Sequence, residues 1–207
     1  MNNKRLQAIA ASACLALCAS SVSAGGFKYT YGELGYRNID SDLMEGDGVR
    51  ASFSFGATDY IHIVGDYSRI WIDDMDGASS VDIDLDEFKI GFGGHYPVTD
   101  KIDIVGQVAY VDQEFSGDAV PSGLDFKTNI NDSEEGYEVV MYGRVLASKK
   151  FELTPHVAHR EVGSESDTGY GLGLVYQLNR KFALRVRGTH FSDESTTNLF
   201  AGVRLYM

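Results

Sequence analysis

The sequence has few of the residues that mark several common protein classes. Only three prolines and two cysteines occur among the 207 residues, and both cysteines, Cys14 and Cys18, lie near the start of the chain. No later stretch approaches the roughly 18 consecutive apolar residues that a membrane-spanning helix needs. Helix start and stop signals are also missing. A disulfide framework, a cysteine-ligated metal site and a helical membrane anchor are therefore excluded after residue 24.

The first 24 residues are predicted to be a secretory signal peptide. Lys4 and Arg5 supply a basic start, and an apolar run follows from about residue 8 to residue 19. Val22 and Ala24 occupy the small-residue positions of an A-x-A-like cleavage site. We expect residues 1–24 to be removed on export, so that residues 25–207 form one domain without cysteine.

Positive charge is scarce. The chain has 18 basic and 30 acidic residues, and removing Lys4 and Arg5 leaves 16 basic residues, a net charge of −14. A chain this acidic has no general positive field with which to bind nucleic acid or anionic lipid. The composition therefore predicts no nucleic-acid partner.

The sequence is rich in segments where apolar residues alternate with polar or small residues, with a period of two. In residues 49–56, for example, Val49, Phe53 and Phe55 alternate with serine and glycine. Such alternation, bounded by turn residues, predicts β-strands with one apolar face. Ten segments have this pattern: 27–38, 48–56, 60–72, 81–96, 102–115, 136–147, 151–163, 169–178, 182–192 and 197–207.

The links between these segments alternate in length. Tight links are expected at 57–59, 97–101, 148–150 and 179–181. Mostly longer and more acidic links are expected at 39–47, 73–80, 116–135, 164–168 and 193–196. A membrane barrel places turns on one rim and loops on the other, whereas a sandwich has no reason to sort them. We therefore predict an all-β, up-and-down antiparallel transmembrane β-barrel of ten strands, with eight strands as the alternative.

Strand parity divides the side chains between the lumen and the outer wall. The predicted interior set holds six acids and eight bases, and this near balance suits a salt-bridged filling, because buried charges need partners. Its members are Glu33, Arg37, Arg50, His62, Asp66, Glu87, Lys89, Asp103, Gln107, Glu138, Arg144, Glu152, His156, Arg160, Arg185, Arg187 and Arg204. Two outer aromatic girdles are predicted: Tyr36, Tyr67, Trp71, Tyr110, Tyr137 and Tyr170 near the long links, and Phe55, Tyr60, Tyr96, Phe151, Tyr176 and Phe182 near the turns.

The chain ends NLFAGVRLYM, without a polar tail. The spacing Gly202-x-x-Leu205-x-Met207 resembles the terminal-strand signature of outer-membrane β-barrels, with Met207 in place of the usual phenylalanine and Leu205 in place of a common tyrosine. The segments YGELGYRNID, FKIGFGGHYPVTDKIDIVGQVAY and YGLGLVYQLNRKFALRVRG resemble small OmpA/OmpX-type outer-membrane barrels, in particular the diffusible-signal-regulated small outer-membrane proteins. This resemblance implies a monomer in the bacterial outer membrane, in contact with its lipids and lipopolysaccharide. It also implies that the barrel-assembly machinery reads the terminal strand.

Glycines and aspartates form two groups that could bind a ligand. The glycines at 91, 93 and 94 and at 169, 171 and 173 lack the strand-to-helix setting of a phosphate loop, and they favour a crowded lumen or a strand bend instead. Asp82, Asp84 and Asp86 resemble calcium ligands, but Glu87 holds the place where an EF-hand needs glycine. Solvated carboxylates are the prediction, with divalent bridging to lipopolysaccharide phosphates left open.

His190 and Ser192 form the sharpest enzyme clue. They resemble the His-x-Ser element of outer-membrane lipid A deacylases, in which a glutamate completes an acyl-transfer triad. Arg204 stands where the acid is expected on the last strand, and Glu194 is a nearby substitute. We therefore predict a non-enzymatic structural or surface-interaction protein, without catalytic, cofactor or metal sites. A narrow porin, a deacylase and a soluble exported binding protein are the alternatives.

Overall fold

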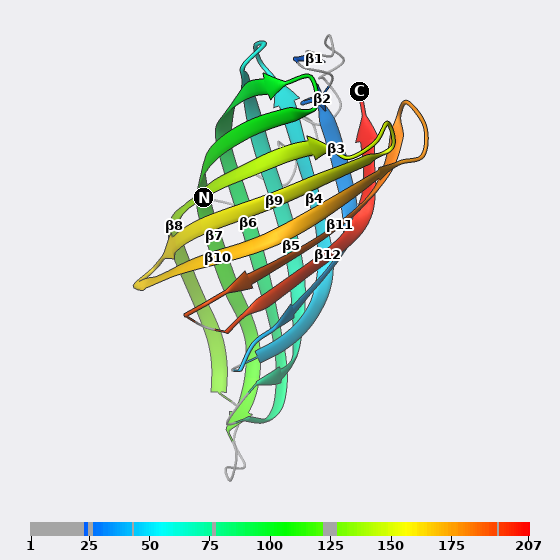
Figure 1. Ribbon diagram of the computed structural model, residues 1–207. Coiled ribbons are helices and arrows are strands. Elements are labelled where there is room, and N and C mark those ends of the chain that lie inside the picture. The colour runs from blue at the N-terminus through cyan, green and yellow to red at the C-terminus, as the bar shows by residue number, and fades with distance from the viewer. Residues whose placement is uncertain (1–22, 25–26, 43, 76–77, 122–127, 194) are drawn as a thin grey trace.

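Ten antiparallel strands close into one barrel. The computed structural model describes residues 23–24, 27–42, 44–75, 78–121, 128–193 and 195–207. Each strand pairs with its neighbours in the chain, and the last strand pairs with the first of the ten, which confirms the predicted up-and-down barrel (Figure 1). The ten strands are β3 (Tyr31–Asp40), β4 (Met44–Gly56), β5 (Ile61–Met75), β6 (Ala78–Thr99), β7 (Ile102–Pro121), β8 (Thr128–Leu146), β9 (Phe151–Val162), β10 (Glu165–Gln177), β11 (Phe182–Phe191) and β12 (Thr197–Tyr206).

The four predicted tight links are confirmed. They connect β4 to β5, β6 to β7, β8 to β9 and β10 to β11, and they share one rim with the C-terminus, at the top of Figure 1. Side-chain oxygens fix the backbone there: Thr58 accepts from the amides of Tyr60 and Ile61, and Asn179 accepts from those of Lys181 and Phe182. We call this end of the barrel the turn rim.

The predicted long links are largely wrong, because the strands continue through most of them. β5 extends to residue 75, β7 extends to residue 121, and β8 already begins at residue 128. The link expected at 164–168 is also mostly strand, since β10 begins at Glu165 after a turn in which Gly163 has a φ of 61°. The strands β5 to β8 therefore project well beyond the rest of the barrel (Figure 1). We call the described residues 69–75, 78–86, 112–121 and 128–135 the outer extension.

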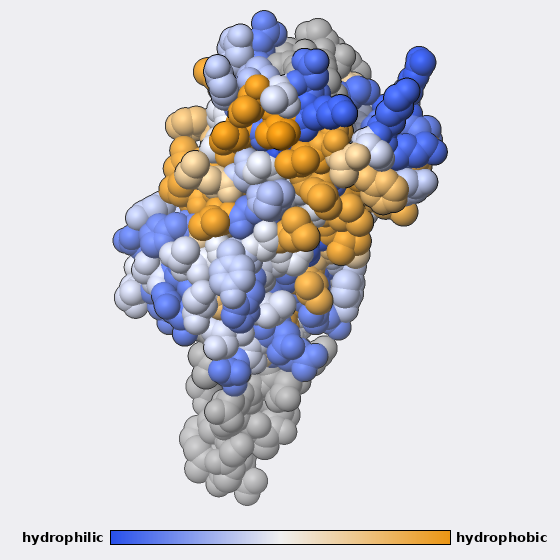
Figure 2. Space-filling view, in the orientation of Figure 1, coloured by the Kyte–Doolittle hydropathy of each residue, from blue (hydrophilic) through white to orange (hydrophobic). Residues whose placement is uncertain are grey.

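The outer wall is apolar over the half of the barrel nearer the turn rim. Figure 2 shows this band in its upper half, with hydrophilic side chains below it. A soluble monomer rarely exposes a continuous apolar belt, whereas a bilayer requires one. Exposed members of the band are Leu34, Ile63, Ile90, Phe92, Ile104, Val139, Met141, Val157, Leu172, Leu174, Leu184, Val186, Leu199 and Val203. Among the described residues there is no helix long and apolar enough to cross a membrane.

Tyrosines mark the limit of this band on the side of the outer extension, as the predicted girdle requires. Tyr67 donates a hydrogen bond to Asp86, and Tyr137 donates one to Glu161. Tyr36 and Asn38 similarly hydrogen-bond the Asp47 carboxylate and hold its pKa below the usual range. The girdle tyrosines thus join the apolar wall to a ring of carboxylates.

The polarity of the inward-facing side chains changes in the opposite sense at about the level of these tyrosines. Inside the outer extension the lumen is apolar: Ile70 and Ile72 of β5 pack with Ile83 and Leu85 of β6, and Ile39 completes the cluster. Met44 and Phe115 pack against it. The charged clusters of the lumen therefore lie where the outer wall is apolar, whereas the lumen is aliphatic where the outer wall is acidic.

The first predicted strand is only partly right. β3 begins at Tyr31, and residues 27–30 turn into the lumen near the turn rim instead of joining the barrel wall. Phe27, Tyr29 and Thr30 are all buried, and residues Phe27–Lys28 form β2, which pairs only with β1 (Ser23–Ala24). We call residues 27–30 the N-terminal plug. Most of the predicted signal peptide and residue 25 lie outside the described residues, so cleavage after Ala24 stays a prediction.

Candidate functional site: the lumen of the barrel

Glu87 on β6 is the centre of the largest ion-pair cluster in the lumen. Its side chain is 1% exposed, and its carboxylate receives Arg37 of β3 at 2.7 Å and Arg160 of β9 at 2.8 Å. Lys89 approaches the same carboxylate at 3.5 Å, and the amide of Gln113 donates to it at 3.0 Å. One buried carboxylate therefore links strands that lie far apart around the barrel, and its several donors offset the cost of burying the charge.

A second cluster lies at the seam where β12 meets β3. Glu33 accepts from Arg204 at 2.6 Å and from Arg185 at 2.8 Å, and the Ser52 hydroxyl donates to it at 3.2 Å. The Arg204 guanidinium also stacks over the ring of Tyr31, 3.9 Å from its centroid. The seam is thus closed by buried charge pairing as well as by backbone hydrogen bonds.

The predicted interior set is confirmed in position. The remaining pairs are Arg50 with Asp66 at 2.6 Å, Lys89 with Glu138 at 2.8 Å and Arg144 with Glu152 at 2.7 Å. The choice of partner could not be predicted, because it depends on the shear of the barrel, which sets the heights of distant strands.

The N-terminal plug fills the lumen near the turn rim. The Tyr29 hydroxyl donates to Asp103 at 2.8 Å, and its ring stacks on His95 with 3.6 Å between the ring centroids. The Arg144 guanidinium lies over the rings of Phe27 and Tyr29 and donates to the carbonyl of Lys28. The alternation in FKYT looks like the start of a strand, so no sequence signal distinguished the plug from the wall.

Glycines on the lumen side provide room for these side chains, as one of the sequence-based interpretations held. A Cβ atom on Gly93 would lie 2.5 Å from Nε2 of His62, and one on Gly171 would lie 2.6 Å from the ring of His156. Both glycines lie on strands with no helix after them. They are therefore a packing feature of a crowded lumen and not a phosphate loop.

His190 and Ser192 are not arranged as an acyl-transfer pair. His190 lies on the outer wall, where Nδ1 contacts the Thr197 hydroxyl at 3.2 Å and the ring packs edge-on against Tyr170. Ser192 is exposed beyond the end of β11, and Arg204 points into the lumen toward Glu33. Glu194 lies outside the described residues. The described residues therefore provide no acid that orients His190.

The three aspartates of β6 are spread along the outer face of the outer extension. Asp82 is exposed, and Asp86 is engaged by Arg69 and Tyr67. Among the residues that the structure describes, no three His, Cys, Asp or Glu side chains are grouped so that they could hold a metal ion. Asp82 agrees with the prediction of solvated carboxylates, whereas the pairing of Asp86 was not predicted.

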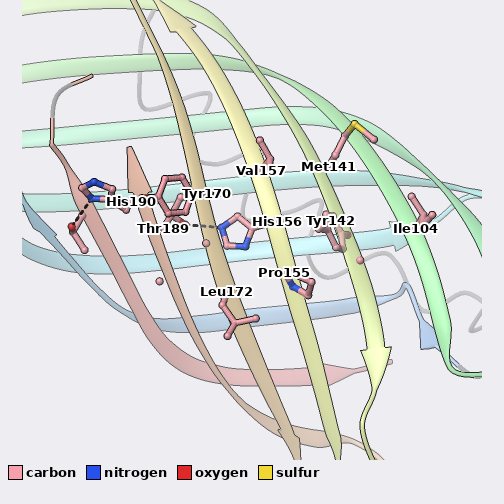
Figure 3. A pocket seen from close by; sticks show the side chains of 14 residues that line it. Ile104, Met141, Tyr142, Pro155, His156, Val157, Tyr170, Leu172, Thr189 and His190 are labelled. Carbon is pink, nitrogen blue, oxygen red and sulfur yellow. Dashed lines mark hydrogen bonds between the residues drawn. The ribbon is translucent and has the colours of Figure 1, made fainter. Parts of the chain in front are cut away.

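An apolar groove of about 730 Å³ lies on the outer wall across β7 to β12. Figure 3 shows Met141, Val157 and Leu172 around it, and the hydrogen-bonded pair His156 and Thr189 lies behind the wall. The outward-facing glycines at 143 and 188 leave the groove open. It lies within the apolar band of the outer wall.

Comparisons with known proteins agree with this architecture. The translocator domain of the autotransporter NalP from Neisseria meningitidis is 9% identical, with a TM-score of 0.53 over 99% of this chain and 94% of that chain. The β domain of the Bordetella autotransporter BrkA is 6% identical, with a TM-score of 0.53 over 86% of this chain and 100% of that chain. Neisserial surface protein A is 12% identical, with a TM-score of 0.45 over 86% and 96% of the two chains.

Likeness at such low identity shows the fold alone, and no curated protein matches the chain. The family model for the outer membrane protein beta-barrel domain, however, matches residues 9–204, which is nearly the whole sequence. The chain therefore belongs to the outer membrane protein beta-barrel domain family.

Proposed function

We propose that this protein is a non-enzymatic, non-conducting outer-membrane barrel that presents the outer extension at the cell surface. The observation that carries the proposal is the filling of the lumen at three levels. The N-terminal plug occupies the end near the turn rim, the ion-pair clusters of Glu87 and Glu33 occupy the middle, and the aliphatic cluster around Ile70 occupies the outer end.

This filling argues against the narrow-porin alternative. A conducting pore needs a continuous wet path lined by side chains that the permeating ion can pass. Here the central cavity of about 100 Å³ lies between an aromatic plug and an aliphatic cluster. An ion would have to displace Tyr29 at one end and Ile70 or Leu85 at the other.

The outer extension has the properties of a presented surface. Its aliphatic interior holds the strands in place, while its outer face is polar, with exposed Asp82, Glu114 and Glu135. This is a folded wall and not a set of loops, so it can offer a fixed arrangement of carboxylates to a surface partner.

We further propose that the apolar band contacts outer-membrane lipids and lipopolysaccharide, that the barrel-assembly machinery reads the terminal strand and that the barrel is a monomer. The apolar parity of Leu205 and Met207, both exposed on the outer wall, supports the second point. Within the family, the residues quoted above favour the small OmpA/OmpX-type group and its diffusible-signal-regulated members.

The purified protein, reconstituted into planar lipid bilayers in potassium chloride, should show no stable conductance steps. The physical reason is that the three levels of filling leave no connected water path. Insertion is verified on the same sample by heat-modifiable mobility on a gel. Steps of uniform size that scale with salt concentration would favour the narrow porin instead.

Surface presentation can be tested with single cysteines, because the exported chain is predicted to have none. A cysteine at exposed Ser133, in the outer extension, should react on intact cells with a maleimide too large and polar to cross the outer membrane. A cysteine at exposed Lys149, on the turn rim, should react only after the outer membrane is permeabilised. The reverse labelling pattern would overturn the proposed orientation.

A further inference from the structure

The cavity at the centre of the lumen has an unusual balance of charge. It measures about 100 Å³, and the side chains around it come from eight strands. Four of them are basic, namely Arg50, Lys89, Arg185 and Arg187, and three are acidic, namely Glu33, Asp66 and Glu138. Only the basic set contains a member without an opposite charge beside it.

The three carboxylates are already occupied. Glu33 is shared by Arg185 and Arg204, Asp66 pairs with Arg50, and Glu138 pairs with Lys89. Within the described part of the chain, no carboxylate lies within ion-pairing distance of Arg187. Its Nε atom instead donates to Nε2 of His156 at 3.2 Å.

His156 does not compensate this charge. Its Nε2 atom receives the Arg187 N–H and also lies 2.9 Å from the Thr189 hydroxyl, while its Nδ1 atom lies 3.3 Å from the carbonyl of Thr154. An arginine can only donate, so Nε2 is an acceptor and the ring proton sits on Nδ1. His156 is therefore a neutral imidazole. Glu138 and Asp66 attract Arg187 only from beyond ion-pairing distance, and each is already paired with another cation, so Arg187 has no carboxylate of its own.

Further polar atoms of the cavity walls also lack partners. Nε of Arg185, Oγ1 of Thr154 and Oδ1 of Asp66 are buried without a hydrogen bond. The first is a donor and the hydroxyl can donate, whereas Asp66 needs a donor. Leaving such groups unpaired in a closed lumen is costly, and leaving a charge unpaired there costs more.

We propose that this cavity binds one small inorganic oxyanion, of the phosphate class, with Arg187 as its principal ligand. Arg185 and Thr154 supply further donors. A protonated phosphate oxygen, or a water beside it, satisfies Oδ1 of Asp66. The cavity of about 100 Å³ has room for such an ion. The site is independent of whether the barrel conducts.

Anion-dependent stability tests the proposal. The protein is refolded in lipid-free detergent at one ionic strength and pH with phosphate, with sulfate or with gluconate, which is a weakly coordinating carboxylate monoanion. We expect phosphate to raise the thermal midpoint by roughly 5 °C over gluconate and to do so saturably, as ligand linkage predicts. Lipid-free detergent ensures that the free ion, and not a lipid phosphate, is the source.

Two variants separate specific binding from a general salt effect. Arg187→Gln should lose the phosphate-dependent rise while matching or exceeding the wild-type midpoint in gluconate, because an unpaired buried charge is gone. Arg69→Gln is the matched control: Arg69 lies on the outer wall, paired with Asp86, so this variant should keep the full rise. An equal rise in all three proteins, or none in the wild type, would overturn the proposal.

A direct measurement covers the case in which Arg187→Gln does not fold. Wild-type protein refolded in radiolabelled phosphate and then desalted should retain about one phosphate per chain. Retention of no phosphate would contradict a closed anion site, whatever the thermal midpoints show.

Discussion

Replacing Glu87 with alanine is expected to lower the free energy of unfolding by about 3–5 kcal/mol, as removal of one partner from a buried ion pair does. Arg37 and Arg160 would both lose their short contacts to this carboxylate, and Lys89 would lose its longer one. Three cations would then share a dry part of the lumen. The urea midpoint of the refolded protein in detergent, read by gel mobility, measures the effect.

The adjacent residue provides a matched control. Asp86 is also paired with an arginine, Arg69, but the pair lies on the outer wall, where the Arg69 side chain is 41% exposed. Exposed ion pairs contribute about 0–1 kcal/mol, so Asp86→Ala should shift the midpoint only slightly. Equal losses in the two variants would mean that the lumen is wet and that Glu87 is not a buried hub.

A second large effect is expected from Val203→Arg on the closing strand. Val203 is 44% exposed on the outer wall, and it pairs with Leu34 and Leu184, which are apolar and exposed as well. It lies between the levels of the two aromatic girdles. An arginine near the bilayer midplane costs about 2–4 kcal/mol in a barrel wall, so the amount of folded protein in the outer membrane should fall sharply.

The effect of depth in the membrane can be separated from the effect of charge with a second substitution on the same strand. Thr197 faces the same side as Val203, but it pairs with Asp40 beyond the tyrosine girdle. Thr197→Arg should therefore assemble almost normally, since the same charge there remains in water. Comparable loss of heat-modifiable protein from outer-membrane fractions of both variants would contradict the assigned position of the apolar band.

Strand number and side-chain parity could be predicted because each depends on local alternation. The glycines of β10 and the charged residues of β11 follow a period of two that survives in any barrel of this shape. The tight links could be predicted for the same reason, since each is a short interruption of that alternation.

The far ends of the outer extension, residues 73–75, 78–80, 116–121 and 128–135, were predicted as links because acidic residues favour loops, whereas the strand pattern of residues 81–86 was predicted. In VDIDLDE the aspartates alternate with Ile83 and Leu85, which is a strand pattern whose apolar face is turned to the inside. The alternation was visible, but its meaning depends on whether water or lipid lies outside. Unless the position of the membrane boundary is known, the sequence does not show which face of such a strand is turned to the inside of the barrel.

The ion-pair partners and the unpaired charge of Arg187 could not be predicted either. An imbalance of two bases over the acids was apparent in the predicted interior set, but not which arginine would be left alone. Which arginine lacks a partner depends on the positions along the barrel axis at which residues of distant strands lie level with one another. Side-chain parity carries no information on these positions.

The reversal of polarity at the tyrosine girdle fixes how deeply the molecule is immersed. Sinking by one step of two residues, about 7 Å along a strand, would carry the carboxylates of Asp47, Asp86 and Glu135 into hydrocarbon. Rising by the same step would expose apolar wall to water. The barrel therefore has one favoured depth in the membrane and little freedom to shift or tilt. The outer extension stands at a constant height above the membrane. In the proposed orientation, a surface partner that bound these carboxylates would meet them at a fixed distance from the membrane.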